Sequence, residues 1–256
     1  VNIKFTEGNC YGLIGANGAG KSTMMNMLYG LLQPTSGKIL IRGKEVTLNS
    51  PVDAIANGIG MVHQHFKLVP SLTVYENILL GAEITQKKGG MKTPFIDQKE
   101  EIKRVEKLIQ ENHLELNATD KIEDISVGGR QRVEILKMLY RNVDILILDE
   151  PTAGQDYRHY TEIMEFLKTI NETQGTTIIM ITHDMHLMLE YTNRAIVVAD
   201  GQLLTIDTPA KVLTDETITA PAYLKQTSLY EMAVKCGIED SSQFVQRFIN
   251  YERAVR

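Results

Sequence analysis

Short apolar runs alternate with longer amphipathic segments along the first 200 residues of the chain. Each run is about one strand long and apolar over most of its length, as expected of strands that helices cover on both faces. The runs lie at residues 10–15, 58–64, 144–150, 176–182 and 194–200. Because most of the segments between them have helical periodicity, the pattern predicts an α/β domain with a mostly parallel sheet.

Helix start and stop residues mark several connections between these runs. Ser50 and Pro51 stand at the start of a short predicted helix and Gly58 stands just past its end, which is the usual placement of these residue types. Ser126 opens a further helix, and residues 38–46 predict a hairpin. These signals set the boundaries of elements that connect the predicted strands.

The segment from Thr73 to about residue 113 has helical rather than strand periodicity. Thr73 and Glu76 match a capping box. One apolar face follows at helical spacing, formed by Ile102, Val105, Leu108 and Ile109. The polar stretch 86–94 is predicted to be a flexible loop. The segment is therefore interpreted as a helical insertion in the α/β domain.

These patterns predict an α/β domain followed by a small helical part. The domain is expected at residues 1–200, with its core at 1–63 and 141–200 and a helical subdomain at about 64–140. After the last predicted strand the pattern changes to short helices, at 208–214, 228–236 and 242–252. We therefore expect a C-terminal helical extension at 201–256.

Composition narrows the class of protein. The 256 residues, 43% of them hydrophobic, are enough for one large globular domain with an insertion. A net charge of −5 and a pI near 5.7 lack the basic excess typical of nucleic-acid binders, so no nucleic-acid partner is expected. No apolar run reaches the roughly 18 to 20 residues of a membrane helix. The chain begins with Val1 rather than Met, and its natural start stays open.

The two cysteines and most of the histidines match no spacing typical of a metal or redox site. Cys10 and Cys236 lie far apart and match no metal-ligand or redox spacing, which favours a reducing, intracellular setting. Surface or packing roles are expected for His63, His65, His113, His159 and His186.

The strongest chemical signal is the stretch from Gly15 to Ser22, a complete G-x-x-x-x-G-K-[ST] motif between a predicted strand and a predicted helix. Its glycines let backbone N–H groups wrap a phosphate chain, and the helix N-terminus adds a favourable dipole. Lys21 is expected to reach the β- and γ-phosphates and the Ser22 hydroxyl to bind Mg²⁺. The alternative is a purely structural glycine turn. The predicted phosphate site comprises Gly15, Asn17, Gly18, Gly20, Lys21, Ser22 and Thr23.

Polar residues also end three other predicted strands. Asp149 and Glu150 follow an apolar run, and ligands of such sheets bind beyond the carboxyl ends of the strands. Asp149 suits a water-mediated Mg²⁺ contact and Glu150 suits work as a general base or in orienting water, although two solvated acids are the alternative. A histidine such as His183 at a strand end is often structural, but a third polar group at this edge favours contact with a γ-phosphate. Gln64, at a further strand end, carries little information alone.

Together these residues resemble the ATP-binding cassette (ABC) ATPases, over essentially the whole chain. The resemblance implies a P-loop NTPase (RecA-like) core of mostly parallel sheet, with an inserted helical subdomain and a small C-terminal helical tail. It implies ATP and Mg²⁺ as ligands. By the same resemblance Gln64 is the metal-sensing loop glutamine, Asp149 the metal-site acid, Glu150 the catalytic glutamate and His183 the switch histidine.

The resemblance also implies a second subunit. The stretch from Ser126 to Arg132 matches the position of the family's signature motif, so Ser126 and Gly128 are expected to contact the ATP of an opposing subunit. Asp156 falls where the family has the aspartate of its D-loop, which communicates across the dimer. Whether that dimer is a homodimer or a heterodimer stays open.

Two parts of the chain resemble different branches of this family. Residues 58–81 and 126–141 are similar to ATPases of sugar and nucleoside importers. Residues 149–160, 181–191 and the tail are similar to ATPases of energy-coupling factor importers for vitamins and metals. Both branches are uptake systems, so the resemblance implies an importer ATPase at the cytoplasmic face of the membrane, bound to an integral membrane subunit. We expect that contact in the residues from Gln64 through the helical insertion. The substrate stays open.

The chain departs from the family pattern in two places. It begins only about 14 residues before Gly15, without the usual upstream strand and the aromatic residue that stacks on adenine, and Tyr11 is a poor substitute. Gly129 stands where the signature motif usually has glutamine. These departures motivate one alternative, a nucleotide-binding ABC protein with weak hydrolysis. A second alternative is a soluble ABC ATPase outside transport, in cluster assembly, DNA repair or translation.

Overall fold

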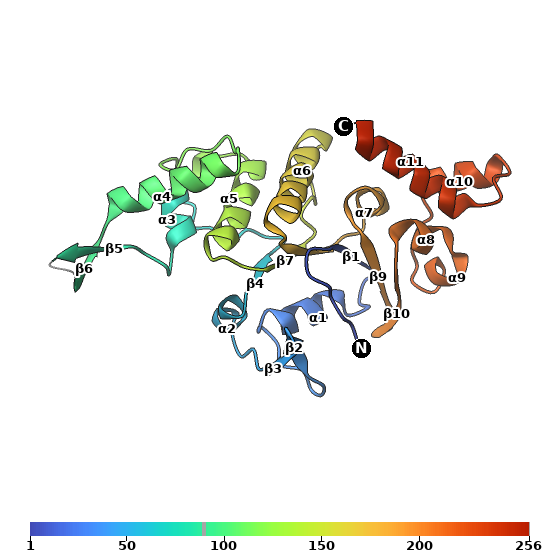
Figure 1. The fold of residues 1–256 in the computed structure, drawn as a ribbon, viewed down its shortest axis with the longest axis horizontal. Helices are drawn as coiled ribbons and strands as arrows, with labels where there is room; N and C mark the ends of the chain where they lie inside the picture. Colours follow the sequence, from blue (N-terminus) through green and yellow to red (C-terminus); the bar gives the residue numbers. More distant parts are fainter. Residues whose placement is uncertain (89–90, 256) are drawn as a thin grey trace.

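A six-stranded sheet forms the centre of the molecule (Figure 1). The computed structural model describes residues 1–88 and 91–255. The strand order is β10-β9-β1-β8-β7-β4, and all neighbours are parallel except β9 with β10. This confirms the predicted, mostly parallel sheet. Its strands are β1 (Cys10–Ile14), β4 (Ile59–Val62), β7 (Ile145–Asp149), β8 (Thr177–Ile181), β9 (Arg194–Ala199) and β10 (Gln202–Asp207).

The two faces of the sheet contribute to separate hydrophobic cores, because successive strand side chains point to opposite sides. On β7, Leu146 and Leu148 enter one core and Ile147 enters the other. The first core includes side chains of α3 (Val74–Leu79), α4 (Gln98–Glu111), α5 (Val127–Tyr140) and α6 (Tyr157–Gln174). The second includes those of α1 (Lys21–Leu28), α2 (Pro51–Ala56) and the predicted hairpin β2–β3 (Ile39–Ile41 and Lys44–Val46).

The predicted helix starts are confirmed by their side-chain caps. Ser50 caps α2, with Pro51 at its first position. Thr73 and Glu76 form a reciprocal capping box at the start of α3. Ser126 caps α5. Each cap satisfies backbone N–H groups that have no partner within the helix, so local sequence determines where these helices begin.

The insertion between β4 and α5 contains a hairpin as well as helices. The stretch 86–94 is not simply the predicted flexible loop, because β5 (Thr85–Lys88) pairs with β6 (Met91–Ile96) in antiparallel fashion. Residues 89–90 of that stretch lie outside the described residues. Its polar composition favours a loop, but two strand-length runs around a Gly-Gly dipeptide also match a hairpin, and the strand pairing decides between them. The hairpin lies at one end of the molecule, beyond α4 (Figure 1).

The part after residue 200 begins with a strand, where helices were expected. Asp200 and Gly201 both have positive φ, 48° and 73°, which is the geometry of a tight type I′ hairpin turn. The chain therefore reverses and adds β10 to the edge of the sheet beside β9. The expected helices begin only at Pro209.

The C-terminal helices pack on the outer end of the sheet around a third core. This core combines side chains of β9 with those of the C-terminal helices and of α7 (Met185–Tyr191), which follows β8. The C-terminal helices are α8 (Pro209–Thr214), α9 (Glu216–Thr219), α10 (Ser228–Lys235) and α11 (Ser241–Val255). Among the helices of the described residues, none has the length and apolar character needed to cross a membrane.

The two cysteines provide a test of this packing. Cys10 on β1 is 6% exposed and its burial raises the pKa of the thiol to about 12, whereas Cys236 is exposed. Because the thiolate is the reactive form, the native protein should react rapidly with a disulfide reagent at Cys236 only, and at both cysteines after unfolding. A native Cys236→Ser variant should show no rapid reaction. Rapid modification of Cys10 in that folded variant would contradict the described position of β1.

Candidate functional site

The loop between β1 and α1 contains three glycines with positive φ, and at Gly15 a side chain would also collide with the neighbouring strand. Gly15 has a φ of +146°, and a Cβ atom there would lie 1.9 Å from the carbonyl oxygen of Val198. Gly18 and Gly20 also have positive φ, 80° and 95°, with open space around the position of a Cβ atom. The backbone of this loop is therefore close to β9 on one side and accessible at its tip, where Asn17 is exposed.

Lys21 lies beneath this loop at the start of α1. Its side chain is 6% exposed, and its Nζ donates hydrogen bonds to the carbonyl oxygens of Gly15 at 2.7 Å and Ala16 at 2.8 Å. Burial lowers the pKa of Lys21, and the nearby carboxylates of Glu150 and Asp149 partly counter this effect. A cation held only by neutral carbonyl groups is well placed to exchange them for a phosphate. The hydroxyl residues Ser22 and Thr23 follow it in the first turn of α1 and are exposed.

The acids, the histidine and the glutamine converge at the carboxyl edge of the sheet. The ends of β7 and β8 are level, since Asp149 is paired with Ile181. His183 Nε2 lies 3.3 Å from Glu150 Oε1, and Gln64 Nε2, beyond the end of β4, lies 3.5 Å from Glu150 Oε2. Side chains from three strand ends therefore meet around the carboxylate of Glu150.

Several neighbouring groups act on the pKa of Asp149, in opposite directions. Burial raises its pKa and the neighbouring Glu150 raises it further, while His63, Lys21 and His183 lower it. Two carboxylates side by side in a partly buried setting favour the approach of a cation. His63, for which only a packing or surface role was expected, is thus close enough to act on Asp149, and burial lowers its own pKa.

The available oxygen donors suit an Mg²⁺ ion that also binds phosphates and water, rather than a metal that is held by protein ligands alone. Mg²⁺ prefers oxygen ligands and usually takes one or two of them from the protein and the rest from phosphates and water. Ser22, Asp149 and Gln64 offer a hydroxyl, a carboxylate and an amide oxygen, at the start of α1 and at the ends of β7 and β4. Within the described residues, no group of three or more His, Cys, Asp or Glu side chains could form a metal site.

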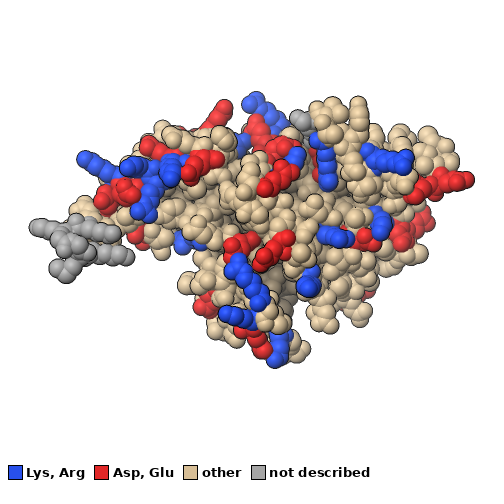
Figure 2. All heavy atoms as spheres, viewed as in Figure 1, with Lys and Arg blue, Asp and Glu red and all other residues tan. Residues whose placement is uncertain are grey.

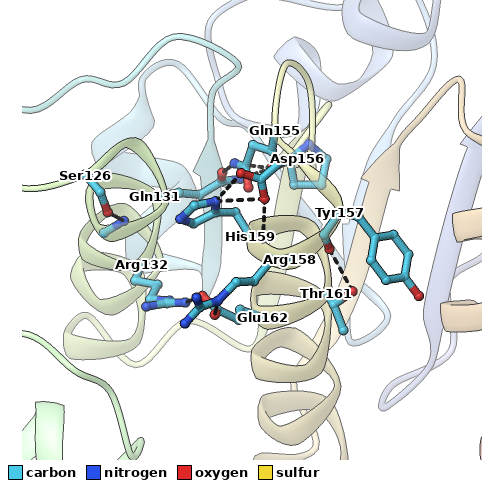
Figure 3. A network of polar contacts seen from close by, with 12 residues as sticks. Ser126, Gln131, Arg132, Gln155, Asp156, Tyr157, Arg158, His159, Thr161 and Glu162 are labelled. Atoms are coloured by element: carbon cyan, nitrogen blue, oxygen red, sulfur yellow. Dashed lines mark hydrogen bonds and ion pairs between the residues drawn. The ribbon is translucent and has the colours of Figure 1, made fainter.

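The remaining predicted residues lie at the starts of two adjacent helices, α5 and α6 (Figure 3). Ser126 is exposed and its Oγ accepts a hydrogen bond from the N–H of Gly129 at 3.1 Å. Gly128 is buried against the ring of His159, where a Cβ atom would lie 3.1 Å from Cδ2. Asp156 is exposed and caps α6, and both of its carboxylate oxygens lie 2.9 Å from Nδ1 of His159. Among the described contacts, none joins these residues to Lys21 or Glu150 directly.

Two glutamines that the sequence analysis did not single out connect α5 to the loop that follows Glu150. Gln131 on α5 is buried, donates a hydrogen bond to the carbonyl oxygen of Pro151 and accepts one from Gln155 (Figure 3). The available signal was a polar residue on the apolar side of a helix, one turn after Gly128. Tyr11, in contrast, is buried with its ring edge-on to Phe5, so it is not placed to stack on a base.

Comparisons with known proteins agree with this geometry. The family model described as ABC transporter matches residues 1–153. A putative ABC transporter ATP-binding protein of Clostridium perfringens is 39% identical over 257 residues, covering 100% of this chain and 43% of the relative. The nucleoside import ATP-binding protein NupA of Lactococcus lactis is 44% identical over 208 residues, covering 81% of this chain and 39% of the relative. The chain therefore spans less than half the length of these relatives.

Solved structures of ATP-binding cassettes share the fold. The dimeric, post-hydrolysis state of the cassette MJ0796 bound to ADP and Pi has a TM-score of 0.66 and 30% identity, covering 82% of this chain and 89% of the other. The structure of cbiO1 from Clostridium perfringens, part of the ABC transporter complex cbiONQ, has a TM-score of 0.71 and 29% identity, covering 93% and 91%. The phosphate loop, the acids at the end of β7 and these matches together show that the chain belongs to the ABC transporter family as one of its ATP-binding cassettes.

Proposed function

We propose that the chain is the ATP-hydrolysing cassette of a membrane importer and that it works together with a second cassette. The observation that carries this proposal is the convergence of Lys21, Glu150 and His183 at the carboxyl edge of the sheet, next to a loop shaped for phosphate. Buried cations and paired carboxylates at such an edge are suited to phosphoryl transfer.

ATP would bind with its phosphates against the loop from Gly15 to Thr23. Lys21 would exchange its bonds to the loop carbonyls for the β- and γ-phosphates, and the free N–H groups at the start of α1 would add further donors. Mg²⁺, when bound, neutralises phosphate charge, and Ser22, Gln64 and, through water, Asp149 are the residues proposed to hold it. The loop and the first turn of α1 thus act as one anion site.

Glu150 would orient the attacking water, and His183 would contact the γ-phosphate. Since His183 and Gln64 both lie within 3.5 Å of the Glu150 carboxylate, the three side chains can fix one water among them. The contribution of the protein is then mainly positioning and charge stabilisation, which is what phosphoryl transfer requires.

The second cassette would complete the site. Ser126 and Asp156 are exposed at helix starts, with Gly128 directly behind Ser126, and these residues are proposed to contact the ATP bound by the opposing phosphate loop. The dimeric cassette bound to ADP and Pi, which shares the fold of this chain, supports such a pair. ATP binding would close the pair and hydrolysis would reopen it.

The cassette is best explained as part of an importer, at the cytoplasmic face of a membrane. NupA is named for nucleoside import, and cbiO1 is part of a transporter complex, so both relatives point to transport and the first to uptake. The segment from Gln64 through the helical insertion is the proposed contact with an integral membrane subunit, which would choose the substrate. No nucleic-acid partner is proposed.

Hydrolysis is tested by Glu150→Gln, which keeps the shape of the side chain and removes its charge. We expect Mg-ATP binding to persist and phosphate release to fall by about 100-fold or more, since a positioned base contributes at least that much. The measurement is phosphate release at saturating Mg-ATP for the wild type and the variant. Equal rates would contradict the hypothesis that the chain hydrolyses ATP. They would favour the alternative of a nucleotide-binding protein with weak hydrolysis, which is motivated by Gly129 in place of the usual glutamine.

The importer setting is tested by co-purification in mild detergent from cells of the natural host. We expect recovery of a membrane protein with several spans together with a second cassette. Val69→Asp, at a 37% exposed position just after Gln64, should weaken that recovery, because a charge would be buried in the contact. Leu204→Asp, at a 41% exposed position on β10, is the matched control and should leave it unchanged. Repeated recovery of the chain without a membrane partner would favour an ABC ATPase outside transport.

A further inference from the structure

A pair of glutamines joins the start of α5 to the loop that follows Glu150. Gln131 is 4% exposed; its Nε2 donates to the carbonyl oxygen of Pro151 and its Oε1 accepts from Nε2 of Gln155. Nε2 of Gln155 also lies 3.4 Å from the same Pro151 oxygen. Figure 3 shows Gln131 reaching from α5 toward the loop that carries Gln155 and Asp156. The two glutamines, called the glutamine pair below, thus span helix and loop.

The chemistry of the groups determines which way each amide faces. A carbonyl oxygen only accepts hydrogen bonds, so the Pro151 oxygen requires the NH₂ end of Gln131. The oxygen end of Gln131 then requires the NH₂ end of Gln155. The oxygen of Gln155 is left as the end of the chain, buried and without a hydrogen-bond partner among the described residues. The two hydrogen bonds therefore run in one direction: Gln155 donates to Gln131, and Gln131 donates to the Pro151 carbonyl.

The loop that this pair holds is conformationally strained. Glu150 has a φ of +48° although it is not glycine and precedes a proline, and residues before proline prefer extended backbone. Such a conformation is unfavourable for a residue with a side chain and persists only where surrounding contacts enforce it.

Two backbone hydrogen bonds hold Glu150, and a side-chain hydrogen bond holds the carbonyl of the residue after it. Its N–H donates to Ile181 O of β8 at 3.0 Å, and its carbonyl oxygen accepts from Ala153 N at 3.1 Å. These two come from the sheet and from the turn itself. The third, Gln131 to Pro151, is the contact that comes from α5. This bond connects the residue after Glu150 to α5, whereas Gln64, at the start of the insertion, contacts the Glu150 carboxylate itself.

Gln131 lies on the same helix as Ser126 and Gly128, which are proposed to contact ATP. Gln131 lies one turn after Gly128, and Ser126 caps the same helix. A rigid helix transmits a displacement of its first turn directly to a side chain one turn further on. A phosphate that docked at Ser126 would therefore act, through Gln131, on the peptide that follows Pro151, one residue beyond Glu150.

We propose that Gln131, supported by Gln155, is a positioning residue for ATP hydrolysis: it fixes the Pro151 carbonyl and thereby holds Glu150 in its working conformation only while α5 is correctly seated. The inference deepens the proposed function and rests on it, because Glu150 must be the group that orients water. It assigns to the glutamine pair the link between the signature stretch of one cassette and the catalytic glutamate of the same cassette.

The variant Gln131→Leu removes the link while keeping the size of the buried side chain. Its matched control is Glu162→Gln, which removes the charge that pairs with Arg132 of α5 and Arg158 of α6 and leaves the loop untouched. With the full 256-residue chain and Mg-ATP, kcat of Gln131→Leu should fall by about tenfold or more, since small displacements of reacting groups have effects of this size. The affinity for ATP should stay within twofold. The control should keep both values within twofold even if its thermal stability falls.

The variant Gln131→Glu supplies a conditional rescue. A protonated carboxyl can donate to Pro151 and accept from Gln155, as the amide does, whereas a carboxylate repels the Pro151 oxygen. Because a buried carboxyl has a raised pKa, kcat of this variant relative to the wild type should rise as pH falls. A purely structural defect would change unfolding but not this ratio measured on folded protein.

Separate outcomes overturn the inference and the proposed function. If Gln131→Leu keeps the wild-type kcat while Glu150→Gln abolishes hydrolysis, the inference fails and the proposed function stands. If the wild type shows no hydrolysis that depends on Glu150, the proposed function fails, and hydrogen exchange of residues 150–156 decides whether the pair holds the loop. Faster exchange in Gln131→Leu than in Glu162→Gln supports the link, and equal exchange refutes it.

Discussion

Parallel pairing of β1, β8 and β7 is the constraint on which the site depends, because parallel neighbours end at the same edge of a sheet. The register aligns Leu13 of β1 and Asp149 of β7 with the same residue, Ile181 of β8. The phosphate loop, the two acids and the segment with His183 therefore leave the sheet side by side. Each side chain proposed to act in hydrolysis needs only the few residues between it and a strand end to reach its position.

The helical insertion packs on the sheet through the first hydrophobic core, and polar side chains also tie it to this edge. Gln131 of α5 holds the loop after Glu150, and the buried Glu134, one turn further along α5, accepts a hydrogen bond at 2.6 Å from the backbone N–H of Lys67. Burial raises the pKa of Glu134, and the Lys67 bond partly counters that effect. One helix thus contacts the segment after Gln64 and the loop after Glu150. Figure 2 shows acidic and basic side chains interspersed over the visible face rather than gathered as one basic surface.

Local sequence predicted the elements and site residues that local physics determines. The phosphate loop, the acids at the end of β7 and the caps at Ser50, Thr73 and Ser126 each follow from a few neighbouring residues. β10 was missed because the pattern after residue 200 was assigned to helices, although Asp200-Gly201 signals a hairpin turn. The partners of Gln131 could not be predicted, since Pro151 and Gln155 are 20 and 24 residues away and only folding brings them together.

The central claim is that ATP binds with its phosphates at the edge formed by Lys21, Asp149 and Glu150. A crystal structure of the Glu150→Gln chain with Mg²⁺ and ATP tests it most directly. The account predicts phosphates within the loop from Gly15 to Thr23, with Lys21 released from the Gly15 and Ala16 carbonyls and Ser22 beside the metal. Phosphates bound elsewhere on the chain, or a loop that stays closed over Lys21 at saturating ATP, would contradict it.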